Sequence, residues 1–260
     1  MRHFKKCAKG FYMSLGMFSG IPLPFHIWDE KYTAVMIALF PIVGLAIGAL
    51  WWLAATLMIF LELPLMLIAA FGSLAPFLIA GFIHLDGLMD TSDALLSYRP
   101  IKDKLRILKD PHVGAFAVVM LVILLLLQFS AMHAVFESGR YLILLVFISV
   151  ISRCCSAFSI FTLRHMPESN YAPMLKQNLS KTHKVFVVLV AIAAIGFAFI
   201  YAGLFGIFVL LAVILGYALA MKKVFKDFKG ISGDLLGYAM VIGELCGLIA
   251  LAAMQGRWVF

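Results

Sequence analysis

Three aspartates stand at the spacing D-x-x-x-D-x-x-D, at Asp86, Asp90 and Asp93. Residues three and four positions apart lie on one face of a helix, so this spacing stacks three carboxylates on the same side. Such like charges repel one another unless water solvates the face or a cation neutralises it. Because oxygen-only ligands favour Mg²⁺, Ca²⁺ or Mn²⁺ over zinc, the sequence predicts a divalent-metal site, with a solvated acidic face as the alternative.

Two neighbours of these aspartates suit a polar ligand. Gly87 allows a phosphate or a metal to approach the backbone closely. His84 lies one step into the preceding apolar run. It is either a structural histidine whose hydrogen bonds are satisfied at the membrane boundary or a group that orients the substrate or the metal.

The connection that follows the aspartates is basic and ends in Lys109-Asp110-Pro111-His112-Val113-Gly114. Membrane topology explains much of this charge. Cations beside a carboxylate–metal site also suit a polyphosphate substrate, whose charge needs several partners. Arg99 is the preferred contact in this connection, because its planar fork matches phosphate.

Three more charged residues lie in or beside apolar stretches. Asp234 opens the last of these stretches, either as a helix N-cap or as a functional carboxylate. Glu244 lies about three helical turns further on, where an acid is costly and is therefore a functional candidate. Arg153 is another charge within an apolar run. We expect Arg153 to pair with Glu244.

Composition shows what kind of element carries these side chains. Of the 260 residues, 64% are hydrophobic and only 13% are charged, and the mean hydropathy is +1.05. A soluble core cannot hide so much apolar surface, so the sequence predicts an all-α integral membrane protein with a single domain over residues 1–260. The net charge of +8 is not gathered into a basic stripe with interleaved aromatics, and we expect no nucleic-acid partner. The four cysteines lack metal-type spacing and are interpreted as small apolar residues.

Seven apolar runs are long enough to span the hydrocarbon core, which takes about 20 residues. The first run carries Pro41, Gly44 and Gly48, which predict a kink or a tilt. Gly203 and Gly206 predict a turn between the fifth and sixth runs. The runs cover residues 33–61, 65–85, 114–135, 141–163, 185–202, 204–221 and 235–255.

Lysine and arginine mark alternate ends of these spans. The N-terminal segment and every second connection are basic, whereas the connections near Glu62, 137–140 and Gly203 hold almost no positive charge. The positive-inside rule therefore places the N-terminus and the three aspartates on the cytoplasmic side. Residues 11–28 are too short and too broken by proline to span, and predict an interfacial or re-entrant helix rather than a signal peptide.

Together these motifs resemble the cobalamin synthase family, the adenosylcobinamide-GDP ribazoletransferases. Their order and spacing agree from near residue 18 to about residue 250. The resemblance rests on the run from His84 to Asp93, on Lys109-Asp110 with Gly114, and on Ser232-Gly233-Asp234 with Leu236-Gly237 and Glu244. Supporting matches are Ile21-Pro22-Leu23-Pro24, Phe40-Pro41-Ile42-Val43-Gly44 and Ser152-Arg153.

The resemblance implies a Mg²⁺-dependent transferase of cobalamin biosynthesis. A ribose hydroxyl of α-ribazole, or of its 5′-phosphate, attacks the phosphorus attached to cobinamide in adenosylcobinamide-GDP, and GMP leaves. The bulky corrinoid would rest near the membrane interface, with residues 11–28 as its cover. The implied setting is the inner or plasma membrane, with the active site toward the cytoplasm and lipid around the protein. A homo-oligomer is left open.

The same resemblance implies roles for individual residues. Asp86 and Asp90 would bind the metal, and Asp93 would be either a third ligand or the catalytic base. His84 is the second catalytic candidate, and Asp110 and Asp234 would complete a second metal site. The residues assigned to substrate binding are Arg99, Lys109, His112, Arg153 and Ser232.

The chain departs from the family pattern at positions that concern the substrate. Gly20 stands where the family usually has Arg, Ala94 where it has Gly, and Pro111-His112 where it has Ser-Arg. The metal carboxylates are intact, so the chain is either a divergent member or one that accepts a different nucleotide base.

Two other functions compete with this interpretation. A CDP-alcohol phosphotransferase also uses clustered aspartates, but its D-x-x-D-G-x-x-A-R opening is absent. An ion-coupled transporter usually places such acids near the membrane midplane, whereas these adjoin a basic connection.

Overall fold

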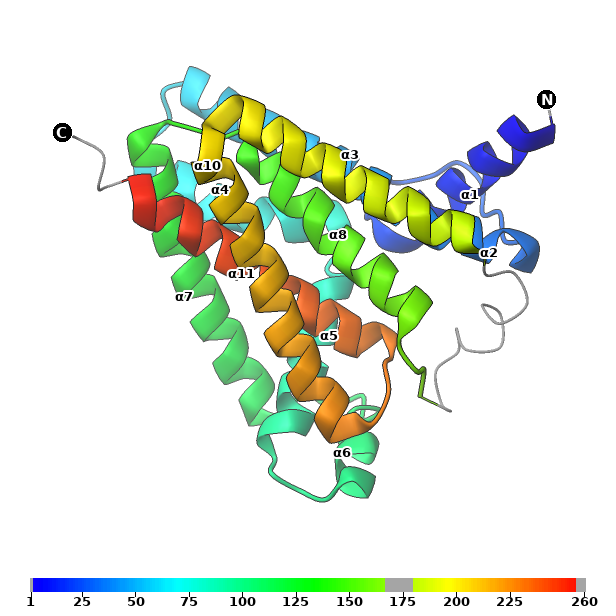
Figure 1. The fold of residues 1–260 in the computed structure, drawn as a ribbon. Helices are drawn as coiled ribbons and strands as arrows, with labels where there is room; N and C mark the ends of the chain where they lie inside the picture. Colours follow the sequence, from blue (N-terminus) through cyan, green and yellow to red (C-terminus); the bar gives the residue numbers. More distant parts are fainter. Residues whose placement is uncertain (1, 167–179, 256–260) are drawn as a thin grey trace.

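The computed structural model describes residues 2–166 and 180–255. Every named element in these residues is a helix, and the only extended pairing among them is an isolated parallel bridge between His165 and Ile231. The helices pack into one bundle (Figure 1). The all-α prediction is confirmed.

Five helices in the described residues are long and apolar enough to cross a membrane. Large apolar side chains point outward from them, including Phe60 and Ile200, which are 80% and 79% exposed. Such exposure fits contact with lipid rather than with water. The five are α3 (Phe40–Phe60), α7 (Ala115–Ser138), α8 (Leu144–Thr162), α10 (Lys181–Phe228) and α11 (Gly233–Gln255).

A sixth span is broken. Helices α4 (Leu65–Ala80) and α5 (Ile83–Leu96) meet the length and hydropathy of a span only together, and the chain bends by 96° between them. The predicted second span, residues 65–85, therefore ends earlier than expected, and α5 is a separate helix.

Helix α10 contains two of the predicted spans. Its assignment is continuous, but Gly203 has the non-helical backbone angles φ 60° and ψ −145°. The two arms diverge from this point (Figure 1), and Gly206 lies directly against the Ala198 backbone. The predicted turn at Gly203 is confirmed, and counting the two arms separately gives the seven predicted segments.

The first predicted span is interrupted at Leu39, between α2 (Thr33–Ala38) and α3. Pro41 falls in the first turn of α3, where its missing N–H is not needed. Gly44 and Gly48 do not contribute to this break. They lie where α3 meets α8, and a Cβ on Gly48 would come within 2.7 Å of the Val146 Cα atom. Their small size permits close helix packing.

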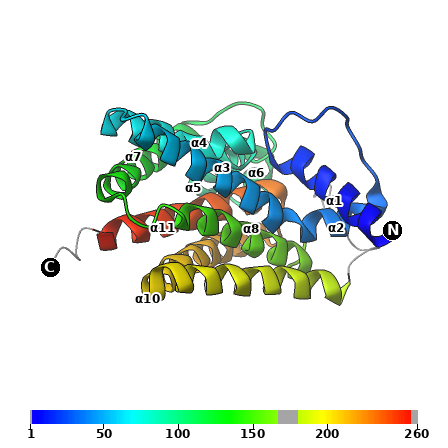
Figure 2. The ribbon, with the colours of Figure 1, turned by 90° about the horizontal axis from the view of Figure 1, so that it is seen from above.

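The N-terminal segment forms α1 (Arg2–Phe18), which is not among the spanning helices and packs against α2 and α3. The helix begins before residue 11, and the irregular stretch 19–29 and the short 3-10 helix η1 (Glu30–Tyr32) follow it. Figure 2 shows α1 and α2 together at one end of the bundle, near the start of α10. The predicted helix is therefore present only up to Phe18, and its interfacial or re-entrant placement stays a prediction.

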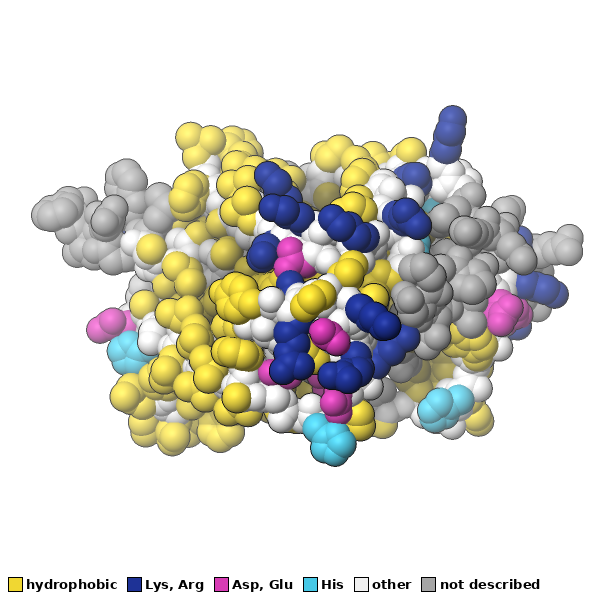
Figure 3. Space-filling view, turned by 90° about the horizontal axis from the view of Figure 1, so that it is seen from below, with side chains coloured by type: hydrophobic (Ala, Val, Ile, Leu, Met, Phe, Trp, Pro, Cys, Tyr) yellow, Lys and Arg dark blue, Asp and Glu magenta, His cyan; other side chains and the backbone are white. Residues whose placement is uncertain are grey.

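Charged side chains gather on one face of the molecule. Figure 3 shows lysine, arginine and acidic side chains close together on this face, with apolar side chains around them. Helix α6 (Ile101–Ile107) lies in the basic connection after α5 and contributes to this face.

Candidate active site

The sharp bend before α5 sets the direction of the aspartate-bearing helix. Gly81 and Phe82 both adopt left-handed angles, with φ of 74° and 63°. The Phe82 N–H donates to the Phe77 carbonyl at 2.9 Å and closes the end of α4. Gly20 packs against Gly81, and its N–H donates to the Ile79 carbonyl at 2.8 Å. The stretch 19–29 is therefore anchored at the bend.

All three motif aspartates lie on α5, as their spacing predicted. Asp86 is exposed, whereas Asp90 and Asp93 are partly buried. Asp86 and Asp93 are close enough to Asp90 to repel its negative charge. The sequence therefore places the three carboxylates correctly on one helix.

A close contact between two helices brings a fourth carboxylate to this cluster. A Cβ on Gly87 of α5 would lie 2.8 Å from the Asp234 carbonyl oxygen and 3.0 Å from its Cα atom. On the same α11 face, Gly237 lies against the backbone of His84. Asp234 consequently repels Asp90 and is itself repelled by Asp86. Gly87 therefore lets the α11 backbone approach α5 closely. From the sequence we had expected this space to admit a phosphate or a metal.

The start of α11 decides between the two interpretations of Asp234. The Ser232 side chain accepts a hydrogen bond from the Leu235 N–H at 3.4 Å, and its carbonyl accepts one from Leu236 at 3.1 Å. Ser232 therefore takes the capping position, and Asp234 lies in the first helical turn. The N-cap interpretation of Asp234 is wrong.

The cluster Asp86, Asp90, Asp93 and Asp234, hereafter the carboxylate cluster, has a donor set that fits Mg²⁺. It offers only carboxylate oxygens, and no member forms an ion pair within the described residues. As these side chains lie, no three acidic, histidine or cysteine groups in residues 2–166 and 180–255 are close enough to enclose an ion. Metal binding therefore requires the carboxylates to converge.

Asp93 links the carboxylate cluster to the loop before α7. Its carboxylate packs directly on Gly114, where a Cβ would overlap both carboxylate oxygens. The Lys109–Gly114 motif is thus brought to the cluster through its last residue.

The other end of that motif faces solvent. Asp110 accepts a hydrogen bond from the His112 N–H at 3.0 Å and lies 2.7 Å from His112 Nδ1. The backbone hydrogen bond, and to a smaller extent the side-chain bond, hold the pKa of the Asp110 carboxyl below its ordinary value. Asp110 is not among the groups that repel Asp90. Its role in a second metal site stays a prediction, as does substrate binding by His112.

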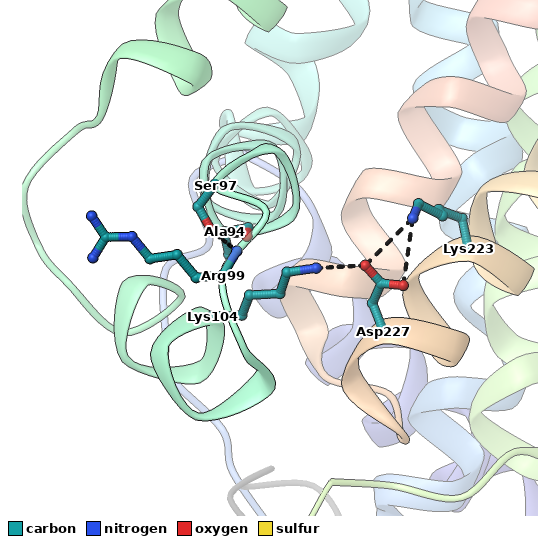
Figure 4. Close-up of polar contacts among 6 residues, drawn as sticks. All are labelled: Ala94, Ser97, Arg99, Lys104, Lys223 and Asp227. Carbon is teal, nitrogen blue, oxygen red and sulfur yellow. Dashed lines mark hydrogen bonds and ion pairs between the residues drawn. The ribbon is translucent and has the colours of Figure 1, made fainter.

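A partly buried ion pair fixes α6 to α10. Lys104 Nζ lies 2.6 Å from Asp227 Oδ2, and Lys223 approaches the same oxygen at 3.4 Å (Figure 4). Lys104 is 8% exposed. Arg99 extends away from this pair (Figure 4), and Lys109 is exposed as well. Sequence reasoning missed the pairing; the lone Asp227 among four lysines was the available signal.

The predicted pairing of Arg153 with Glu244 is confirmed. Ser152 Oγ donates to the same Glu244 oxygen at 2.7 Å, and Arg153 donates to Ser149 Oγ at 2.9 Å. Arg153 is 1% exposed. Its hydrogen bonds run to α8 and α11, and a substrate contact for it stays a prediction.

His84 points into the bundle rather than outward with Asp86. The side chain is buried, its ring centre lies 6.0 Å from that of Phe40, and its Nε2 has no hydrogen-bond partner among the described residues. The catalytic role assigned to it stays a prediction.

The sequence model of a family described as Cobalamin-5-phosphate synthase matches residues 10–252. The chain belongs to the cobalamin-5-phosphate synthase family. The match includes the carboxylate cluster and the Arg153–Glu244 pair, so the predicted resemblance is confirmed.

Curated members of this family are similar over almost their whole length. A protein of Clostridium botulinum named adenosylcobinamide-GDP ribazoletransferase is 40% identical over 247 residues, 95% of this chain and 98% of the relative. Proteins of the same name from Clostridium perfringens and Lachnoclostridium phytofermentans are 37% and 30% identical, over 94% and 98% of this chain and 97% of each relative. No solved structure matches the chain.

One departure from the family pattern has a structural explanation. Gly20 stands where the resemblance expects Arg, and a Cβ there would lie 2.9 Å from the Gly81 Cα atom. In this member of the cobalamin-5-phosphate synthase family, the stretch after α1 therefore packs on the α4–α5 bend without a side chain between them.

Proposed function

We propose that this protein is an adenosylcobinamide-GDP ribazoletransferase that joins α-ribazole, or its 5′-phosphate, to adenosylcobinamide-GDP and releases GMP. The observation that carries this proposal is the carboxylate cluster. Its four acids come from two helices, lack a cationic partner in the described chain, and adjoin a basic connection. The names of the relatives supply the substrates.

Mg²⁺ is the proposed cofactor. When bound, it neutralises the diphosphate and the charge that develops on the leaving phosphate. Asp86 and Asp90 are the proposed primary ligands because they lie one helical turn apart on α5 and both lie near Asp234. Asp234 lies near Asp86 and Asp90 because Gly87 lets α11 approach α5 closely.

Asp93 differs from the other three because its carboxylate lies against Gly114 at the edge of the cluster. We assign it as a further ligand or as the base that takes the ribose hydroxyl proton. The hydroxyl oxygen then forms a bond to the phosphorus attached to cobinamide, and the bond from that phosphorus to the GMP oxygen breaks. The leaving GMP carries away the bonding electron pair.

Arg99 and Lys109 are the proposed contacts of the diphosphate. Both lie in the connection whose middle helix, α6, is fixed by the Lys104–Asp227 pair. Both side chains are exposed, so they can reach a substrate without breaking an ion pair between described residues. The charge pattern of the sequence favours a cytoplasmic active site in the inner or plasma membrane.

Purified protein in lipid nanodiscs tests the substrate assignment. We expect Mg²⁺-dependent GMP release from adenosylcobinamide-GDP only when α-ribazole or its 5′-phosphate is present. CDP-activated alcohols serve as control donors and should give no CMP. No GMP release, together with turnover of a CDP-activated alcohol, would overturn the proposal.

A further inference from the structure

A second polar site lies apart from the carboxylate cluster, where α1, α2 and the first turn of α10 meet. It is a pocket of about 950 Å³. None of the described residues that line it is acidic, which makes it unlike the carboxylate cluster in charge. Its polar lining comes from Lys6, Lys9, Lys31, Ser180, Thr182 and His183.

The pocket is held in shape by contacts of its walls. Gly10 lets α1 approach α2, because a Cβ there would lie 2.6 Å from Val35 Cγ1. Lys9 Nζ lies 5.5 Å from the centre of the Tyr32 ring, a cation–π distance that holds the ammonium over the wall. The Lys31 N–H donates to Asp29 Oδ1 at 3.1 Å, which fixes the backbone from which its side chain extends.

Part of the pocket lining is apolar. Val35, Ala38, Leu39 and Phe186 belong to this part. Phe186 also begins an outward apolar stripe on α10, where Leu189 is 57% exposed. His183 also lines the pocket, and its Nδ1 atom is buried without a hydrogen-bond partner among the described residues.

A pocket lined by both lysines and apolar side chains, at the end of a membrane-spanning helix, complements a molecule with an anionic head and a hydrocarbon tail. We propose that this pocket binds an anionic phospholipid. The phosphate of its headgroup contacts Lys6, Lys9 and Lys31, and one acyl chain follows α10 past Phe186 and Leu189. This site is independent of the proposed transferase activity.

Cys7 makes the proposal testable, because it lines the pocket and is exposed, unlike the other three cysteines. The rate at which a charged maleimide labels Cys7 in the detergent-purified full chain is followed by peptide mass spectrometry. Dioctanoyl phosphatidylglycerol should slow this labelling at concentrations at which dioctanoyl phosphatidylcholine does not. Each lysine near a membrane surface contributes about fivefold to the affinity for an anionic lipid. The combined variant Lys6→Gln/Lys9→Gln/Lys31→Gln should therefore need about 100-fold more phosphatidylglycerol.

The matched control is Lys102→Gln/Lys222→Gln/Lys226→Gln, which removes the same charge at exposed positions outside the pocket. Phosphatidylglycerol should slow the labelling of Cys7 in this control variant as much as in the unchanged chain. Thermal unfolding of both variants checks that they fold. Equal protection by the two lipids, or full protection of the pocket variant, would overturn the proposal. Protection by glycerol phosphate alone at the same concentration would also overturn it, by showing a site for soluble anions.

Discussion

The carboxylate cluster and the Arg153–Glu244 pair are two groups of charged side chains that share α11 but are stabilised in opposite ways. Glu244 is partly buried and contacts Arg153 and a serine hydroxyl, so its charge is balanced within the chain. Asp234, near the start of the same helix, joins three other acids and no described cation. The charges of Arg153 and Glu244 therefore balance each other within the chain. The negative charge of the carboxylate cluster is left for a cation from outside.

Physical costs explain the contrast. A buried charge without a partner is strongly destabilising, so Arg153 and Glu244 must be kept together. Repulsion among carboxylates near the polar face is a smaller cost, because water reaches Asp86 and screens it. The first group therefore holds helices together, and the second is suited to bind a cation. Four substitutions test this division.

Replacement of Asp90 should have the largest effect on activity. Asp90→Asn removes the carboxylate that lies near each of the other three, and GMP release should fall about 1,000-fold or more. Because the change also relieves repulsion, thermal unfolding should occur at the same or a higher temperature. Near-normal turnover would remove Asp90 from the metal site and make the cluster a solvated acidic face.

Replacement of Glu244 should act on stability instead. Glu244→Leu leaves Arg153 buried without its counter-charge and should cost about 3–5 kcal/mol of unfolding free energy. The double variant Arg153→Met/Glu244→Leu should recover much of this loss in a denaturant titration. Equal stability of the single and double variants would show that the pair does not hold α8 to α11.

Gly87 belongs to the carboxylate-cluster side of this comparison, because it sets the distance between α5 and α11 beside Asp234. Gly87→Ala should push Asp234 away from Asp86 and Asp90 and lower GMP release about 10–100-fold. Gly196→Ala is the matched control, since no atom lies within 4 Å of a Cβ there. If Gly87→Ala were as harmless as the control, the close α5–α11 contact would not matter for the site.

The smallest effect is expected from the ion pair that holds α6. Lys104→Met should loosen the connection that carries Arg99 and Lys109, and raise KM about threefold to tenfold with little change in kcat. Lys102→Met, at an exposed position of the same helix, should leave both constants unchanged. A fall in kcat at constant KM would point to a role in the chemical step.

Features that depend on local spacing were predictable from the sequence. The three aspartates share one face of α5 because their spacing is three and four residues, and Gly203 turns the chain because glycine tolerates its backbone angles. Arg153 and Glu244 were predictable as partners because few charges lie within the apolar runs.

Features that depend on which surfaces meet were not predictable. The 96° bend before α5 comes from two successive left-handed residues, and Phe82 gives no sign of this conformation in the sequence. The contact of Gly87 with Asp234 arises only once α5 and α11 pack together. Lys104 and Asp227 are 123 residues apart, and no local pattern joins them.

The central claim is that the carboxylate cluster binds a divalent cation and that the Arg153–Glu244 pair does not. Direct measurement of metal binding tests this claim. Mn²⁺ binding to the purified full chain can be followed by electron paramagnetic resonance, with Mg²⁺ as competitor. We expect saturable binding that Mg²⁺ displaces, loss of that binding in Asp90→Asn, and its retention in Arg153→Met/Glu244→Leu. Unchanged Mn²⁺ affinity in Asp90→Asn would contradict the account.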